Sequence, residues 1–176
     1  MSEEIKPVKF AHAVFRTSRF AEVVAWWKNL LHAEPVFEND FIAFLTYDDE
    51  HHRIAIAALP NLEKRSSKAE GLEHIAYTYA TLGDLLATYA RLKSDGVEPY
   101  WCINHGPTTS MYYRDPDGNQ VELQVDNFTT KEELKAFFAT DVFLKNPIGV
   151  EFKPDELLRK FREGVPEKEL VRQGSA

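Results

Sequence analysis

The chain has 176 residues, 44% of them hydrophobic, which is enough for one domain with a buried core. A formal net charge of −7 without a basic stripe argues against nucleic acid as a partner, because such a surface repels phosphate backbones. Cys102 is the single cysteine, which excludes an intrachain disulfide and a thiolate-rich zinc site. The apolar runs are short and the N-terminus is acidic, so we expect a cytoplasmic protein with no membrane span and no secretory signal.

The first third of the chain predicts a strand, a helix and further strands. The first strand contains His12, and the helix lies near Arg19–Leu31, where Ser18 is a candidate N-cap. Runs of β-branched and apolar residues then predict strands at Asp40–Thr46 and Arg53–Leu59. The first third therefore reads as one module with a strand, a helix and then several strands.

The middle third predicts the same order of elements. A strand at Leu72–Tyr77 precedes a helix at Leu82–Lys93, which starts after Thr81 and stops at Asp95-Gly96. Three more strands are predicted, separated by turns, at Tyr100–Asn104, Thr109–Arg114 and Asn119–Asp126. The last two flank Asp115-Pro116-Asp117-Gly118, which is typical of a hairpin turn.

The last third predicts a helical tail. Thr130 and Glu133 have capping-box spacing for a helix that runs through Phe138, and a second helix is predicted from Pro154 to Glu163. Between them, residues 146–153 carry turn residues and a short apolar stretch, so we expect this segment to cross the domain surface.

Two segments of the chain align as copies of one unit. Phe10–Phe15 aligns with Leu72–Tyr77, and Tyr47–Ala55 aligns with Arg114–Glu122. The offset grows from 62 residues, between His12 and His74, to 67 residues at the end of the second alignment. The same elements in the same order with a few loop insertions indicate a duplicated module.

The repeat assembles a candidate metal site. If the copies pack around a pseudo-twofold axis, His12 and His74 occupy equivalent strand positions, and Glu122 ends the same inner surface. Two imidazoles and a carboxylate leave open positions on an octahedral ion, which suits a non-haem Fe(II) that binds substrate and O2. Ala55 stands where symmetry would put a fourth ligand. The alternative is that both histidines are buried and bonded to backbone, with Glu122 solvated beside a turn.

Several motifs together resemble the type I extradiol dioxygenases of the vicinal oxygen chelate superfamily, over roughly residues 8 to 128. The motifs are Phe10-Ala11-His12, His51-His52-Arg53-Ile54-Ala55, Leu72-Glu73-His74-Ile75-Ala76-Tyr77 and Tyr112-Tyr113-Arg114-Asp115-Pro116-Asp117-Gly118-Asn119-Gln120-Val121-Glu122. The resemblance is to the short, one-domain members that act on biphenyl diols. It implies an α+β fold in which two paired βαβββ modules, about 8–60 and 70–128, form one domain (8–128), followed by a helical extension (129–176).

The resemblance also implies roles for three further residues. His52 resembles the histidine that assists proton transfer, Tyr112 resembles the tyrosine that bonds the ring oxygens, and His105 resembles a further pocket histidine. Strand alternation favours His51 over His52, unless a bulge or loop shifts the parity. For Tyr112, the alternative is an aromatic residue packed in the core, and Tyr113 competes with it for the position that faces the pocket. For His105, the alternative is a solvated histidine in a loop.

The predicted function is an Fe(II)-dependent extradiol dioxygenase that cleaves a catechol-type ring with O2, with Mn(II) as the other metal that suits the ligand set. One alternative is a glyoxalase-like isomerase or lyase with Zn(II) or Ni(II), although such enzymes use a carboxylate where Ala55 stands. Another is a metal-free small-molecule binding protein of the same fold. The sequence does not identify the natural catechol, and a homo-oligomer is compatible with it.

Overall fold

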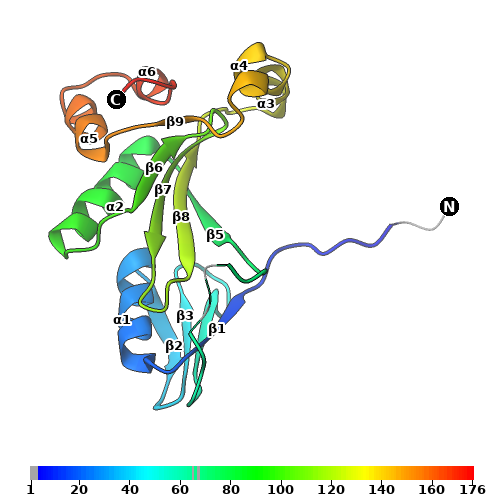
Figure 1. The fold of residues 1–176 in the computed structure, drawn as a ribbon, viewed down its shortest axis with the longest axis vertical. Coiled ribbons are helices and arrows are strands. Elements are labelled where there is room, and N and C mark those ends of the chain that lie inside the picture. Colours follow the sequence, from blue (N-terminus) through cyan, green and yellow to red (C-terminus); the bar gives the residue numbers. More distant parts are fainter. Residues whose placement is uncertain (1–3, 65, 67) are drawn as a thin grey trace. The chain divides into compact units, whose positions relative to one another are not determined.

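The structure, a computed structural model, describes residues 4–64, 66 and 68–176. It contains two separate β-sheets, each with its own helices (Figure 1). The chain divides into two compact units, unit 1 (Met1–Ala69 and Asp115–Gly118) and unit 2 (Glu70–Arg114 and Asn119–Ala176). Among the described residues, no helix is long and apolar enough to cross a membrane.

The sheet of unit 1 has four strands in the order β1-β4-β3-β2, with β1 parallel to β4 and the other pairs antiparallel. Helix α1 buries one apolar face, formed by Val23, Val24, Trp27 and Leu30. The elements are β1 (Ala13–Thr17), α1 (Phe20–Leu31), β2 (Glu34–Glu38), β3 (Ile42–Thr46) and β4 (Ile54–Ala58).

The sheet of unit 2 repeats this arrangement in the order β5-β8-β7-β6 and adds β9 beside β6. Strand β5 is parallel to β8, and the other pairs are antiparallel. The elements are β5 (His74–Tyr79), α2 (Leu82–Ser94), β6 (Trp101–Asn104), β7 (Thr108–Arg114) and β8 (Gln120–Asp126). Two βαβββ modules are thus present, and the predicted α+β fold is confirmed.

The strand registers test the predicted equivalence of Ala55 and Glu122. In unit 1, Val14 pairs with Ala55 across β1 and β4. In unit 2, Ala76 pairs with Glu122 across β5 and β8. Because Val14 and Ala76 are 62 residues apart, the same offset that relates His12 to His74, Ala55 and Glu122 occupy corresponding places in the two sheets.

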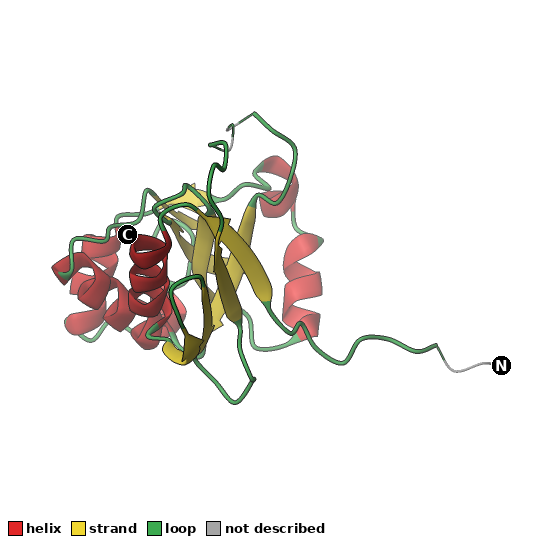
Figure 2. Ribbon diagram, turned by 90° about the horizontal axis from the view of Figure 1, so that it is seen from below, coloured by secondary structure: helices red, strands yellow, loops and turns green. Residues whose placement is uncertain are grey.

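The tail belongs to unit 2 and contains α3 (Lys131–Phe138), α4 (Asp141–Lys145), β9 (Val150–Glu151), α5 (Pro154–Arg162) and α6 (Glu167–Leu170). Figure 2 draws all helices in red and all strands in yellow; in Figure 1, α5 and α6 lie beside the C-terminus, whereas α3 and α4 form a separate pair. The capping box predicted at Thr130 and Glu133 is present, and α5 packs against α2.

The structure corrects one local prediction and adds two strands that were not predicted. Ser18 does not cap α1: the N-cap is Arg19, whose side chain makes no capping bond and whose backbone N–H donates to Thr17 Oγ1 at 2.8 Å. Strand β2 was not predicted because every residue in it is exposed, which removes the hydrophobic alternation. Within the segment expected to cross the surface, the exposed residues Val150–Glu151 form β9, an edge strand antiparallel to β6.

Candidate active site

A histidine and a carboxylate meet where β5 lies beside β8 in unit 2. His74 Nε2 lies 3.0 Å from Glu122 Oε2, and the Glu122 residue is only 5% exposed. Burial of an ionised carboxylate is costly unless a cation or strong donors compensate it. Two donor atoms at about 2.1 Å from one ion, at about 90° to each other, would lie about 3.0 Å apart. The observed pair therefore fits a shared metal ion as well as a direct ion pair.

Tyr112 lies directly across from Glu122 in the pairing of β7 with β8. Its ring packs edge-on to His74, with centroids 5.3 Å apart, and against Trp101 at 4.9 Å. Burial, followed by the Glu122 charge, raises the pKa of Tyr112, so the phenol keeps its proton. Its hydroxyl is a hydrogen-bond donor beside the His74–Glu122 pair.

Tyr113, the alternative to Tyr112, belongs to the core. It is 1% exposed, and its hydroxyl contacts Met111 Sδ at 3.9 Å. Successive strand residues point to opposite faces of a sheet, so only one of the two tyrosines can lie on the Glu122 face. Tyr112 occupies that face.

His105 joins the same cluster from the loop between β6 and β7. Its Nε2 lies 3.0 Å from the Tyr112 hydroxyl, and its Nδ1 lies 2.5 Å from the carbonyl oxygen of Ile148. Unit 2 therefore brings together four of the six predicted site residues: His74, His105, Tyr112 and Glu122.

The other two predicted residues lie together in unit 1. His12 directly precedes β1, and its ring centroid is 4.3 Å from that of His52 and 6.0 Å from that of His51. Ring nitrogens of these three histidines lie within 4.8 Å of one another, a spacing at which they could hold a metal ion. The described part of unit 1 thus contains a histidine-rich group around the predicted ligand His12.

The two members of the His51-His52 pair have different environments. Both precede β4, which begins at Ile54, so strand alternation does not extend to them. His52 is partly buried and stacks on Phe44, with ring centroids 4.6 Å apart, whereas His51 is exposed. Burial, and then the nearby charges of His12 and His51, lower the pKa of His52. A neutral imidazole beside His12 can accept a proton.

The sequence interpretation missed two residues that hold the segments before His12 and His74. The Arg53 guanidinium donates to the carbonyl oxygens of Phe10 and Ala11, at 2.5 and 3.1 Å, and Asp48 accepts from it at 3.0 Å. The Gln120 amide donates to Glu73, at 3.3 Å to its carbonyl oxygen and 2.7 Å to its carboxylate. The internal alignment carries the signal, because it superimposes Arg53 on Gln120.

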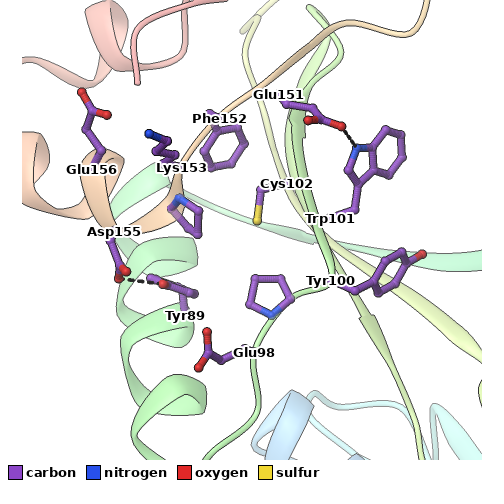
Figure 3. A pocket seen from close by; sticks show the side chains of 12 residues that line it. Tyr89, Glu98, Tyr100, Trp101, Cys102, Glu151, Phe152, Lys153, Asp155 and Glu156 are labelled. Carbon is purple, nitrogen blue, oxygen red and sulfur yellow. Dashed lines mark hydrogen bonds between the residues drawn. The ribbon is translucent and has the colours of Figure 1, made fainter.

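A separate cavity of about 600 Å³ lies between β6, α2 and the tail in unit 2 (Figure 3). Its lining includes none of the six predicted site residues. Cys102 borders it, but burial raises the pKa of this thiol to about 12, so it offers no thiolate nucleophile. The indole N–H of Trp101 donates to Glu151 at 2.8 Å, and the Tyr89 hydroxyl donates to Asp155 at 2.7 Å. Glu151 and Asp155 belong to the tail, so tail residues form part of the cavity wall.

Known proteins share the sequence pattern over most of this chain. Residues 9–123 match the family described as the glyoxalase/bleomycin resistance protein/dioxygenase superfamily. Biphenyl-2,3-diol 1,2-dioxygenase 2 from Rhodococcus globerulus is 48% identical over 159 residues, which cover 90% of this chain and 84% of that protein. Biphenyl-2,3-diol 1,2-dioxygenase 3 from the same organism is 43% identical over 165 residues, covering 93% and 87%.

Solved structures share the fold at low sequence identity. The lactoylglutathione lyase from Agrobacterium tumefaciens has a TM-score of 0.55 at 16% identity, covering 68% of this chain and 94% of that one. The fosfomycin resistance protein FosX from Listeria monocytogenes has a TM-score of 0.54 at 22% identity, covering 73% and 98%. Likeness at this level concerns architecture alone.

Proposed function

Because the chain belongs to the glyoxalase/bleomycin resistance protein/dioxygenase superfamily, we propose that it is an extradiol dioxygenase, which opens a catechol-type ring beside its two hydroxyl groups with O2. Two relatives that match at least 84% of their own length and share 43–48% identity are named biphenyl-2,3-diol 1,2-dioxygenases. The observation that carries the proposal is the cluster of His74, Glu122 and Tyr112, which places two side chains of types that bind metals beside a phenol hydroxyl.

The proposed metal is Fe(II), with Mn(II) as an alternative, bound by His12, His74 and Glu122. The donor set fits, since two imidazoles and one carboxylate suit a divalent metal that keeps open positions. The nearly buried Glu122 carboxylate supports the assignment, because a cation would offset the cost of its burial. When bound, such an ion makes a catechol hydroxyl more acidic and provides a position for O2.

The remaining polar residues handle the substrate and its protons. Tyr112 keeps its proton, and its hydroxyl oxygen accepts a hydrogen bond from a catechol hydroxyl. His52, with its lowered pKa, is neutral near pH 7; it accepts a proton released by the catechol and returns it later in the cycle. His105, whose Nε2 lies 3.0 Å from the Tyr112 hydroxyl, holds that hydroxyl in place.

The glyoxalase-like alternative has less support. Such enzymes use a carboxylate in the first module at the place that corresponds to Glu122, and the register puts Ala55 there. Alanine offers no ligand atom, so three protein ligands remain in the proposed set. Three ligands leave room for both a bidentate catechol and O2.

We further propose that residues 8–128 form the catalytic domain and that residues 129–176 are an extension of it. The substrates are a catechol-type compound and O2. The names of the two relatives make 2,3-dihydroxybiphenyl the first catechol to test.

The test is anaerobic reconstitution of the purified protein with Fe(II), or in parallel with Mn(II), followed by 2,3-dihydroxybiphenyl, catechol or 3- and 4-substituted catechols. Air is then admitted, and oxygen uptake is followed together with visible absorbance. We expect oxygen consumption with a yellow ring-opened product, absent in a His74→Ala control. Elemental analysis of the same samples gives the bound metal.

Two results would contradict the proposal. A protein that binds iron but consumes no oxygen with any catechol is not an extradiol dioxygenase. Oxygen uptake that persists unchanged in His74→Ala would place the metal elsewhere, and the histidine group of unit 1 would then be the site to examine.

A further inference from the structure

We propose that the C-terminal tail positions His105: the carbonyl oxygen of Ile148 holds the His105 ring in the tautomer that carries its proton on Nδ1, so that Nε2 accepts the hydrogen bond of the Tyr112 hydroxyl. His105 is then a positioning residue that acts through Tyr112. This inference rests on the proposed function, because it gives the tail a part in orienting the hydroxyl that contacts the catechol.

The tautomer follows from hydrogen-bond chemistry. A carbonyl oxygen can only accept, so the ring nitrogen 2.5 Å from the Ile148 oxygen must carry a proton. In a neutral imidazole the other nitrogen is then an acceptor. That nitrogen, Nε2, lies 3.0 Å from the Tyr112 hydroxyl, which is therefore the donor. The backbone of the tail thus sets the direction of the hydrogen bond at Tyr112.

The loop that carries His105 is also fixed from the end of the chain. Asn104 is 3% exposed, and its side-chain amide donates to the carbonyl oxygen of Val171 at 2.8 Å. The Gln173 amide donates to the carbonyl oxygen of Asn104 at 3.0 Å. Two residues near the C-terminus therefore hold the residue next to His105.

Two glycines allow the tail to approach this loop closely. A Cβ on Gly149 would lie 2.2 Å from the Asn104 carbonyl oxygen and 2.7 Å from His105 Cα, and one on Gly106 would lie 2.1 Å from Phe137 Cζ. Both glycines have positive φ, of +113° and +98°, a conformation that favours glycine. Side chains at these two positions would force the tail away from His105.

Strand β9 anchors the segment that contains Ile148. Val150 pairs with Asn104, and the Trp101 indole N–H donates to Glu151 at 2.8 Å (Figure 3). Strand pairing alone would attach the tail to the sheet. The additional hydrogen bond between the Ile148 carbonyl oxygen and the His105 ring also lets this segment determine which ring nitrogen of His105 carries the proton.

The first experiment reads the tautomer directly. Nitrogen-15 NMR of the full-length, metal-free protein labelled at its six histidines resolves Nδ1-protonated from Nε2-protonated rings, and His105→Gln assigns the relevant signals. We expect a fixed Nδ1–H form for His105. An Nε2–H form, or signals averaged between the two tautomers, would overturn the proposal, and neither result depends on activity.

The second experiment moves the tail with Gly149→Ala, with Gly164→Ala as the matched control. Gly164 also has positive φ (+84°) and also lies in the tail, but a Cβ there meets nothing within 4 Å. We expect Gly149→Ala to mix the His105 tautomers and to lower kcat about tenfold, with little change in KM or iron content, and Gly164→Ala to keep the wild-type tautomer and kcat.

The outcomes separate this proposal from the proposed function. Unchanged tautomer and kcat in Gly149→Ala would overturn the positioning role of the tail. If Gly149→Ala does not fold, the wild-type tautomer measurement decides alone. If the wild-type protein consumes no oxygen, the proposed function fails, while the tautomer still reports whether the tail orients His105.

Discussion

The two modules have the same strand order but differ in whether the last strand carries a carboxylate at the corresponding position. In the first module β4 carries Ala55, whereas the corresponding residue of β8 in the second module is Glu122. Both modules keep a histidine at the corresponding place, His12 and His74, and both hold the preceding segment with a side chain, Arg53 or Gln120. Both copies therefore carry a histidine at the corresponding place, whereas only the second copy carries a carboxylate at the corresponding place on its last strand.

The largest effect should come from removing the carboxylate that distinguishes the second module. In Glu122→Gln we expect bound iron and oxygen uptake to fall by more than about 100-fold, because loss of groups that merely support ligands already costs about 10–100-fold. Elemental analysis and oxygen uptake measure this. Asp126→Asn, on the same strand but exposed, is the control. Full iron content in Glu122→Gln would remove Glu122 from the ligand set.

The next effect concerns the histidine pair of the first module. We expect His52→Ala to lower kcat about 100-fold, in the range of a lost general acid or base, with iron content unchanged. His51→Ala, which removes an exposed ring, should change kcat less than about threefold. Steady-state kinetics compares the two variants. The reverse order would assign proton transfer to His51.

A carboxylate placed at residue 55, the first-module position that corresponds to Glu122, should also lower activity. In Ala55→Glu we expect iron to bind but kcat to fall about tenfold, because an added carboxylate would compete for an open coordination position. Since Ala55 is only 2% exposed, the metal-free protein should also lose about 1–3 kcal/mol in free energy of unfolding, measured by urea denaturation. Ala55→Gln controls for side-chain size. Equal kcat in the two variants would mean that the carboxylate does not reach the metal.

The smallest effect should come from the residues that hold the segments before the histidines. Gln120→Ala removes the amide bonds to Glu73, so we expect iron affinity to fall about fivefold, corresponding to about 1 kcal/mol. Arg53→Ala should have the larger effect, because it removes bonds to two carbonyl oxygens. Titration of the metal-free variants with Fe(II) under anaerobic conditions compares them. A larger loss in Gln120→Ala would contradict this order.

Most of the fold was predictable because the repeat and the helix signals are local or periodic. The helix predicted after Thr81 begins there, with Thr81 accepting from a backbone N–H at 3.0 Å, and Thr130 accepts from a backbone N–H at 3.1 Å as its capping-box spacing predicts. The alignment of the two copies predicted the equivalence of Ala55 and Glu122, which the strand registers confirm. The superfamily and the fold followed from the same repeat and from the motifs within it.

The remaining features depend on contacts that residue types do not encode. The choice between His51 and His52 could not follow from alternation, since β4 begins only at Ile54. The contact of His105 with Ile148 joins residues 43 positions apart through a backbone carbonyl, which every residue has. The ligand set and the acid–base residues stay predictions until the variants above are measured.

The burial of Cys102 has a consequence for handling a protein that works with O2. The residue is 8% exposed, and the raised pKa of its thiol, about 12, keeps it from forming the thiolate that oxidants attack. Storage in air should therefore neither cross-link molecules through their single cysteine nor oxidise it. Activity lost during purification should return with ferrous salt and ascorbate, and thiol reductants alone should not restore it.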